Sequence, residues 1–171
     1  EPVVAAKMAN AAPPSALCSV VVPEQLSAEE FDSIFSARVW TRVKSPDGRW
    51  TLLVDDEQQC RMISLIERRC IDLPTSMASC VVFSPDSQRL AVGTTDGRLL
   101  ILRGPDWSIE QNIGRGPAIR SVDWSPAGDR IAMCSEAGDI KLLASTDLTC
   151  ISMRRLPMTF LNCVRFSPDA N

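Results

Sequence analysis

The stretch Cys80–Leu102, CVVFSPDSQRLAVGTTDGRLLIL, alternates short apolar runs with residues that form turns. Val81–Phe83 leads into Ser84-Pro85-Asp86, where proline fixes φ and the serine and aspartate side chains can bond the local backbone. Leu90–Val92 follows, and Asp96-Gly97 then reverses the chain, because Asp-Gly tolerates the positive φ of a tight hairpin. The runs are too short for helices, so the stretch predicts successive antiparallel strands.

The same turn recurs along the chain about every 40 residues. Its four copies are Ser45-Pro46-Asp47-Gly48, Ser84-Pro85-Asp86-Ser87, Ser125-Pro126-Ala127-Gly128 and Ser167-Pro168-Asp169-Ala170. Helical solenoids are excluded, because proline and glycine cut each unit into runs too short for paired helices. A fourth, more polar strand is expected at Ser108–Ile113, so that each unit is a sheet of four strands.

The pattern VVFSPDSQRLAVGTTDGRLLIL and its copies resemble the WD-repeat proteins, whose units are four-stranded blades of a β-propeller. The sequence departs from that family in two ways. The Gly-His pair is absent, and the Trp-Asp pair is replaced by Leu102-Arg103 and Leu143-Ala144. The resemblance therefore implies an all-β propeller whose blades are held by packing and turn chemistry.

The expected domain organisation has three parts. Residues 1–17 form a flexible Ala/Pro-rich lead-in, residues 18–38 a strand and a short helix, and residues 39–171 a partial propeller. Ser27 and Glu30 have the spacing of a capping box, which places the helix near Ala28–Ser36. It either packs on one end of the propeller, the reading we favour, or docks a partner. The blades are expected at residues 39–74, 79–114, 119–156 and, incomplete, 160–171.

Three complete blades do not close a propeller, which typically needs four to eight. We therefore expect Cys163–Phe166 to be the inner strand of a fourth blade. Either the sequence continues or other protein subunits complete or cover the open propeller, because soluble proteins avoid exposed sheet faces and edges.

Composition disfavours several functions. The net charge is −3, so no overall basic field would attract nucleic acid or an anionic membrane. The chain lacks histidine, and its seven cysteines include no C-x-x-C pair, so neither a zinc site nor a histidine-based catalytic centre is expected. We expect reduced thiols, no catalytic residue, no cofactor, no metal and no small-molecule substrate.

The candidate site is a set of loop residues predicted to contact a protein partner. In the WD-repeat family, the second-to-third turns of the blades share a face with the links between blades. Trp107 lies in a loop, and tryptophan is enriched at interface hot spots. The candidates are Asp55, Asp56, Trp107, Arg115, Arg120, Arg154 and Arg155. Asp55-Asp56-Glu57 could hold a divalent cation, but a solvated hairpin is the favoured reading.

The sequence therefore predicts a non-catalytic protein–protein interaction scaffold within a larger assembly, in the cytoplasm. One alternative is a structural WD-repeat component of a centrosomal, ciliary or microtubule-associated complex, since FDSIFS, SPDGRW and WSPAG loosely resemble such proteins. Another is a non-catalytic propeller that is part of a larger enzyme or exchange factor.

Overall fold

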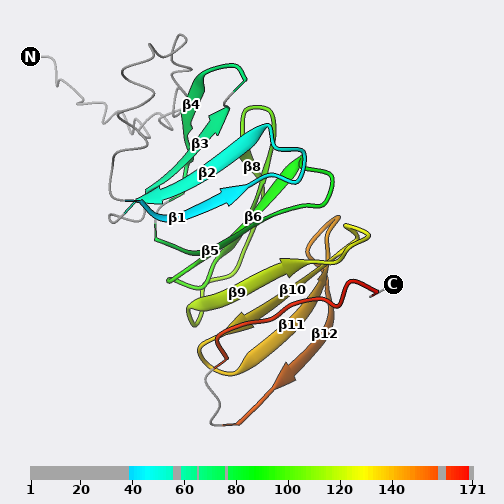
Figure 1. Ribbon diagram of the computed structural model, residues 1–171. Helices are drawn as coiled ribbons and strands as arrows, with labels where there is room; N and C mark the ends of the chain where they lie inside the picture. Colours follow the sequence, from blue (N-terminus) through cyan, green and yellow to red (C-terminus); the bar gives the residue numbers. More distant parts are fainter. Residues whose placement is uncertain (1–38, 56–58, 65, 76, 158–160, 170–171) are drawn as a thin grey trace, which may run out of the picture.

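The computed structural model describes residues 39–55, 59–64, 66–75, 77–157 and 161–169 (Figure 1). These residues form three antiparallel four-stranded sheets and no helix. The expected lead-in, the strand and helix of residues 18–38, and Asp56 lie outside the described residues.

Each sheet is one blade, and its strands are paired in chain order. Blade 1 contains β1 (Val39–Lys44), β2 (Trp50–Asp55), β3 (Cys60–Ser64) and β4 (Arg69–Asp72). Blade 2 contains β5 (Ala78–Phe83), β6 (Arg89–Thr94), β7 (Leu99–Arg103) and β8 (Ser108–Ile113). Blade 3 contains β9 (Ile119–Trp124), β10 (Arg130–Ser135), β11 (Asp139–Ala144) and β12 (Cys150–Arg155). The predicted all-β fold with three complete four-stranded blades is confirmed.

A serine at the end of each inner strand holds the recurring turn. In blade 2, Ser84 Oγ accepts a hydrogen bond from Arg89 N at 2.9 Å and donates one to Asp86 Oδ1 at 2.5 Å. Ser45 does the same in blade 1 with Trp50 N and Asp47 Oδ1. These bonds satisfy polar groups at a point where the serine is almost fully buried, which explains why the motif recurs.

The blades follow one another in space as they do in the chain, with blade 2 between the other two (Figure 1). Their inner strands lie side by side, and Ser79 Oγ of β5 donates to Ile119 O of β9 at 2.5 Å. Packing between blades supplies the two hydrophobic clusters of the core.

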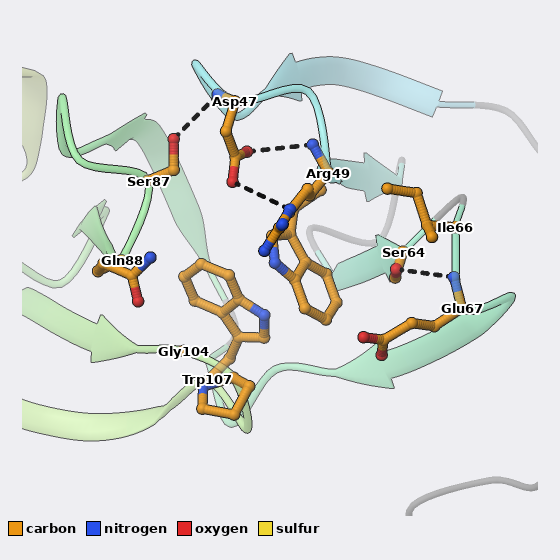
Figure 2. Close-up of a pocket in the computed structure, with 11 residues that line it drawn as sticks. Asp47, Arg49, Ser64, Ile66, Glu67, Ser87, Gln88, Gly104 and Trp107 are labelled. Atoms are coloured by element: carbon orange, nitrogen blue, oxygen red, sulfur yellow. Dashed lines mark hydrogen bonds and ion pairs between the residues drawn. The ribbon is translucent and has the colours of Figure 1, made fainter.

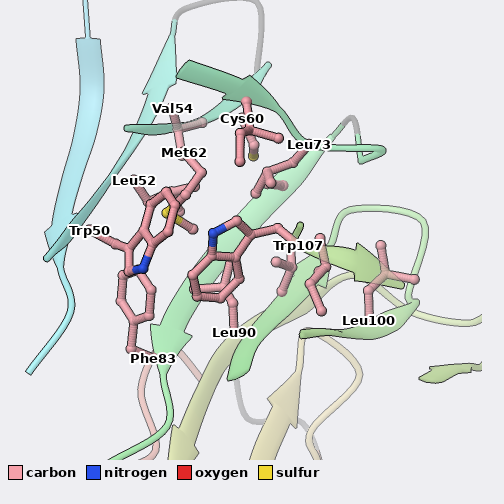
Figure 3. Close-up of a cluster of buried hydrophobic side chains, with 14 residues drawn as sticks. Trp50, Leu52, Val54, Cys60, Met62, Leu73, Phe83, Leu90, Leu100 and Trp107 are labelled. Carbon is pink, nitrogen blue, oxygen red and sulfur yellow. The ribbon is translucent and has the colours of Figure 1, made fainter. Parts of the chain in front are cut away.

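The first cluster fills the space between blades 1 and 2 around Trp107 (Figure 3). The Trp107 ring meets Trp50 of blade 1 edge-to-face at 5.4 Å between centroids, and Phe83 at 5.7 Å. Such pairs contribute about 0.5–1.5 kcal/mol beyond the area they bury.

The second cluster joins blades 2 and 3. Ala91, Leu99 and Ile101 from blade 2 pack against side chains of β9, β10 and β11. At its border the guanidinium of Arg89 from blade 2 lies 4.9 Å from the ring centroid of Trp124 in blade 3, a cation–π contact. All three blades are thus joined through continuous side-chain packing.

Residues 161–169 contact blade 3 without forming a strand. Phe166 N donates to Asp123 Oδ2 at 2.7 Å, and Ser121 Oγ donates to Val164 O at 3.4 Å, so the segment lies along β9. The inner strand predicted at Cys163–Phe166 is therefore not seen in the structure. The segment meets β9 through side-chain bonds, and no following strand pairs with it among the described residues.

Candidate protein-binding surface

Two opposite loop faces arise from the blade geometry. The link face carries the β6–β7 turn, the β8–β9 link and the β10–β11 turn, defined as residues 95–98, 114–118 and 136–138. Backbone bonds join these segments: Gly116 N donates to Asp96 O at 3.2 Å, and Glu136 N donates to Ala118 O at 2.9 Å. The turn face carries the serine-centred turns and the β3–β4 and β7–β8 turns.

Three of the predicted arginines lie on or beside the link face. Arg120 pairs with Glu136 through Nη2 and Oε2 at 3.0 Å. Arg155 holds both carboxylate oxygens of Asp139, at 2.5 Å from Nε and 2.8 Å from Nη2. Arg115 is exposed in the β8–β9 link. The structure therefore brings these charges to one side of blades 2 and 3, as expected for the loop face.

Hydrogen bonds hold the carboxylates of this face in their charged form. The hydrogen bond from Thr94 is the largest cause that lowers the pKa of Asp96, and the charges of Arg98 and Arg115 act in the same direction. The hydrogen bond from Arg155 lowers the pKa of Asp139, with a further contribution from the charge of Lys141. The face is thus a fixed array of charges at neutral pH.

Asp55 belongs to blade 1 and Arg154 to the outer strand of blade 3. Asp55 ends β2 and accepts a hydrogen bond from Gln59 N at 2.9 Å, while Arg61 Nη2 lies 3.8 Å from its Oδ2. Its carboxylate therefore bonds the backbone just before β3. Arg154 is exposed on β12 beside Arg155, and strand alternation points the two arginines to opposite faces of the sheet.

Trp107 is a core residue with an exposed fraction of 0%. Its ring lies between blades 1 and 2, so its side chain presents no surface to a partner. The predicted partner contact of Trp107 stays a prediction, and the burial speaks against it.

A cavity of about 450 Å³ opens on the turn face between blades 1 and 2 (Figure 2). Its lining includes Trp50, Trp107 and the charged residues Asp47, Arg49 and Glu67. Asp47 N donates to Ser87 Oγ of blade 2 at 3.0 Å, which fastens one edge of the cavity across the blade boundary.

No sequence pattern indicates this cavity. Its walls come from four turns of two blades, and no local motif marks such a juxtaposition. Its size falls in the range of ligand pockets, but the rim carboxylates already accept hydrogen bonds from neighbouring arginines and backbone groups.

Within the described ranges, no group of three or more metal-ligating side chains comes together, and no helix could cross a membrane.

The comparisons with known proteins agree with this architecture. Residues 81–168 match the family model of the anaphase-promoting complex subunit 4 WD40 domain. The chain belongs to this WD40-domain family. The predicted WD-repeat resemblance is therefore confirmed, despite the missing Gly-His and Trp-Asp pairs.

A solved structure similar to this WD40 chain is the crystal structure of RRP9 WD40 repeats, with a TM-score of 0.61 and 16% sequence identity. The match covers 70% of this chain and 39% of that one, so the chain spans well under half the length of this neighbour. At that identity the likeness shows the fold alone. No curated protein matches the sequence.

Proposed function

We propose that this WD40 chain is a non-catalytic protein–protein interaction scaffold that acts within a larger assembly. Propellers of this kind generally display variable loops on a rigid body, and other proteins bind to those loops. The stacked blades and the bonded link face supply the rigidity. The net charge of −3 supports a protein partner rather than nucleic acid or an anionic membrane.

The outer strand of blade 3 is the observation that carries this proposal. Every residue of β12 is exposed, and Ile151 and Met153 are 54% and 50% exposed. Leu156, just beyond the strand, is 38% exposed. These apolar side chains neighbour Arg154 and Arg155, and apolar side chains combined with arginine are typical of interface cores.

The position of β12 adds a second reason. It is an edge strand of its sheet, with β11 on one side. An edge strand presents unpaired backbone groups, which soluble proteins usually cover or protect with charge. We therefore propose that another protein subunit covers this side of blade 3, completing or extending the propeller.

The test compares the proteins captured by three forms of the full chain, namely the wild type, a double variant and a control variant. The double variant Ile151→Asp/Met153→Asp places charge on β12, and Ile66→Asp is the matched control, since Ile66 is 74% exposed in blade 1. Each captured protein is identified by quantitative mass spectrometry, purified, and titrated directly against the three forms.

We expect at least one purified partner to bind the wild type and the Ile66→Asp control equally, and the double variant about tenfold more weakly or worse. Exposed substitutions change stability by roughly 0.5 kcal/mol or less, so thermal melting should show all three forms folded. If every partner binds the double variant as well as the wild type, β12 is not the interface.

The identity of the assembly is a separate proposal. The matched family is named after a subunit of a complex, which supports a role inside an assembly. A cytoplasmic location and a centrosomal, ciliary or microtubule-associated role come from the sequence alone, as does a place in a larger enzyme or exchange factor. Microscopy of the tagged chain and co-sedimentation with microtubules test the first two.

A further inference from the structure

A small cavity of about 100 Å³ lies on the link face, between the β6–β7 turn, the β8–β9 link and blade 3. Arg115, Ser135, Asp139 and Lys141 line it together with three glycines. We propose that this cavity binds the carboxylate of an acidic side chain on a partner protein. The inference rests on the proposed scaffold function and names the chemistry that the partner presents.

Charge is the first argument. Arg155 donates two hydrogen bonds to Asp139, so the carboxylate in the cavity wall is already paired. Arg115 and Lys141 are the other two charged residues of the lining. The charge of Arg115 lowers the pKa of Asp96, and the charge of Lys141 lowers the pKa of Asp139. Among the residues that the structure describes, neither of these two cations has a hydrogen-bonded anion, and the one carboxylate in the lining is already paired, so the cavity favours an added negative charge.

The second argument is a buried hydroxyl without a partner. Ser135 lines the cavity with an exposed fraction of 3%, and its Oγ has no hydrogen-bond partner among the described residues. Buried polar atoms are almost always hydrogen-bonded, and an unpaired one costs free energy. A carboxylate in the cavity would accept a hydrogen bond from this hydroxyl.

The third argument is size. A water molecule occupies about 30 Å³ in the liquid, so the cavity holds roughly three water-sized groups. That volume admits a carboxylate and is too small to enclose a nucleotide. Asp139 in the wall disfavours a doubly charged phosphate, because its own negative charge would repel the second charge.

The probe for the test is a fluorescent hexaglutamate peptide, with hexaglutamine as the uncharged comparison. Fluorescence anisotropy with the full chain at low ionic strength measures the dissociation constant. The variants are Lys141→Gln, Arg115→Gln and Ser135→Ala. Lys44→Gln is the matched control, because Lys44 is exposed at the end of β1 on the turn face.

We expect hexaglutamate to bind and hexaglutamine not to bind. Lys141→Gln and Arg115→Gln should each weaken the peptide about tenfold, since each removes a charged donor. Ser135→Ala should weaken it about fivefold by removing a neutral donor. Lys44→Gln should bind as the wild type does, and circular dichroism should show all variants folded.

Several results would overturn the inference. Absence of hexaglutamate binding, or equal weakening by Lys44→Gln, would show that no specific carboxylate site exists. Tighter binding of a phosphoserine peptide would reject the carboxylate, and equal competition by free glutarate would indicate a small-molecule site. If partners found through the β12 experiment bind the wild type and Lys141→Gln equally, this inference fails while the scaffold proposal stands.

Discussion

The burial of the Trp107 side chain differs from what its neighbours in the sequence indicate. It follows Gly104-Pro105-Asp106, which indicates an exposed turn, yet its ring lies in the core between blades 1 and 2 (Figure 3). The aromatic partners Trp50 and Phe83 are far away in the sequence. Local sequence therefore predicted the turn but could not predict the direction of the side chain.

Replacement of Trp107 should destabilise the fold. Trp107→Ala removes the largest fully buried side chain, and we expect a loss of about 3–5 kcal/mol in the free energy of unfolding. Trp107→Phe should cost less than half of that, because Trp107 Nε1 has no hydrogen-bond partner among the described residues to lose. Urea denaturation measures both values.

The exposed Ile66 supplies the control for this comparison. Ile66→Ala should change the free energy of unfolding by roughly 0.5 kcal/mol or less. A cost for Trp107→Ala no greater than that of Ile66→Ala would mean that the ring does not join the blades.

The cysteines divide into buried and exposed thiols. Burial, with the nearby charge of Asp55, raises the pKa of Cys60 to about 12, and burial raises that of Cys80 to about 11. Cys150 and Cys163 are exposed, and all four are free. The thiolate is the reactive form, and a raised pKa keeps the thiol protonated at neutral pH.

Alkylation by iodoacetamide should therefore separate the two classes. At neutral pH we expect Cys150 and Cys163 to react first, and Cys60 and Cys80 to react only after denaturation. Raising the pH to 9 should speed the exposed thiols and leave the buried ones slow, because their pKa values lie higher still. Equal rates for all four, measured by mass spectrometry, would contradict the described burial.

At the scale of elements, the turns show which parts of the sequence pattern are physical requirements. Asp47 and Asp86 each accept a hydrogen bond from the hydroxyl of the serine two residues before. Blade 3 has Ala127 at that position, and Asp129 takes over, accepting from Ser125 Oγ at 2.7 Å. The turn was predictable because the serine recurs. That a different aspartate would accept the serine hydrogen bond in blade 3 was not predictable.

Two glycines allow a matched test of blade contact. Gly97 and Gly48 both have positive φ, +79° and +73°. A Cβ on Gly97 would clash with the backbone of Gly116, whose O, C and N atoms would lie within 2.5 Å, whereas a Cβ on Gly48 would meet nothing within 4 Å.

Gly48→Ala should therefore cost only the backbone strain, about 1–2 kcal/mol. Gly97→Ala should add about 1–3 kcal/mol, because the β6–β7 turn must move away from the β8–β9 link. Thermal or urea unfolding measures the difference. Equal costs would show that the two segments do not touch in solution.

The candidate surface was predictable only in part. Arg115 lies in the β8–β9 link, Arg120 is the second residue of β9 and Arg155 is the last residue of β12, so topology alone placed them near one face. The ion pairs of Arg120 with Glu136 and of Arg155 with Asp139 depend on the way the β10–β11 turn contacts its neighbours. The two cavities combine residues from separate blades, and no pattern in one segment predicts that.

At the scale of the whole molecule, the repeat predicted the three blades and their order. A period near 40 residues with a turn in each unit allows few other architectures. The segment Cys163–Phe166 has the pattern of an inner strand, but a strand needs a neighbour to pair with, and the described residues supply none. The inner strand at Cys163–Phe166 therefore stays a prediction.

The stacking of the blades is the central claim, because the link face, both cavities and the proposed interface depend on it. The most direct measurement is a nuclear Overhauser spectrum of the isotope-labelled chain. It should contain cross-peaks between the rings of Trp50 and Trp107, whose centroids are 5.4 Å apart across blades 1 and 2. It should also link Arg89 to Trp124, 4.9 Å apart across blades 2 and 3. Cross-strand peaks within each sheet without these two contacts would show that the blades form but do not stack.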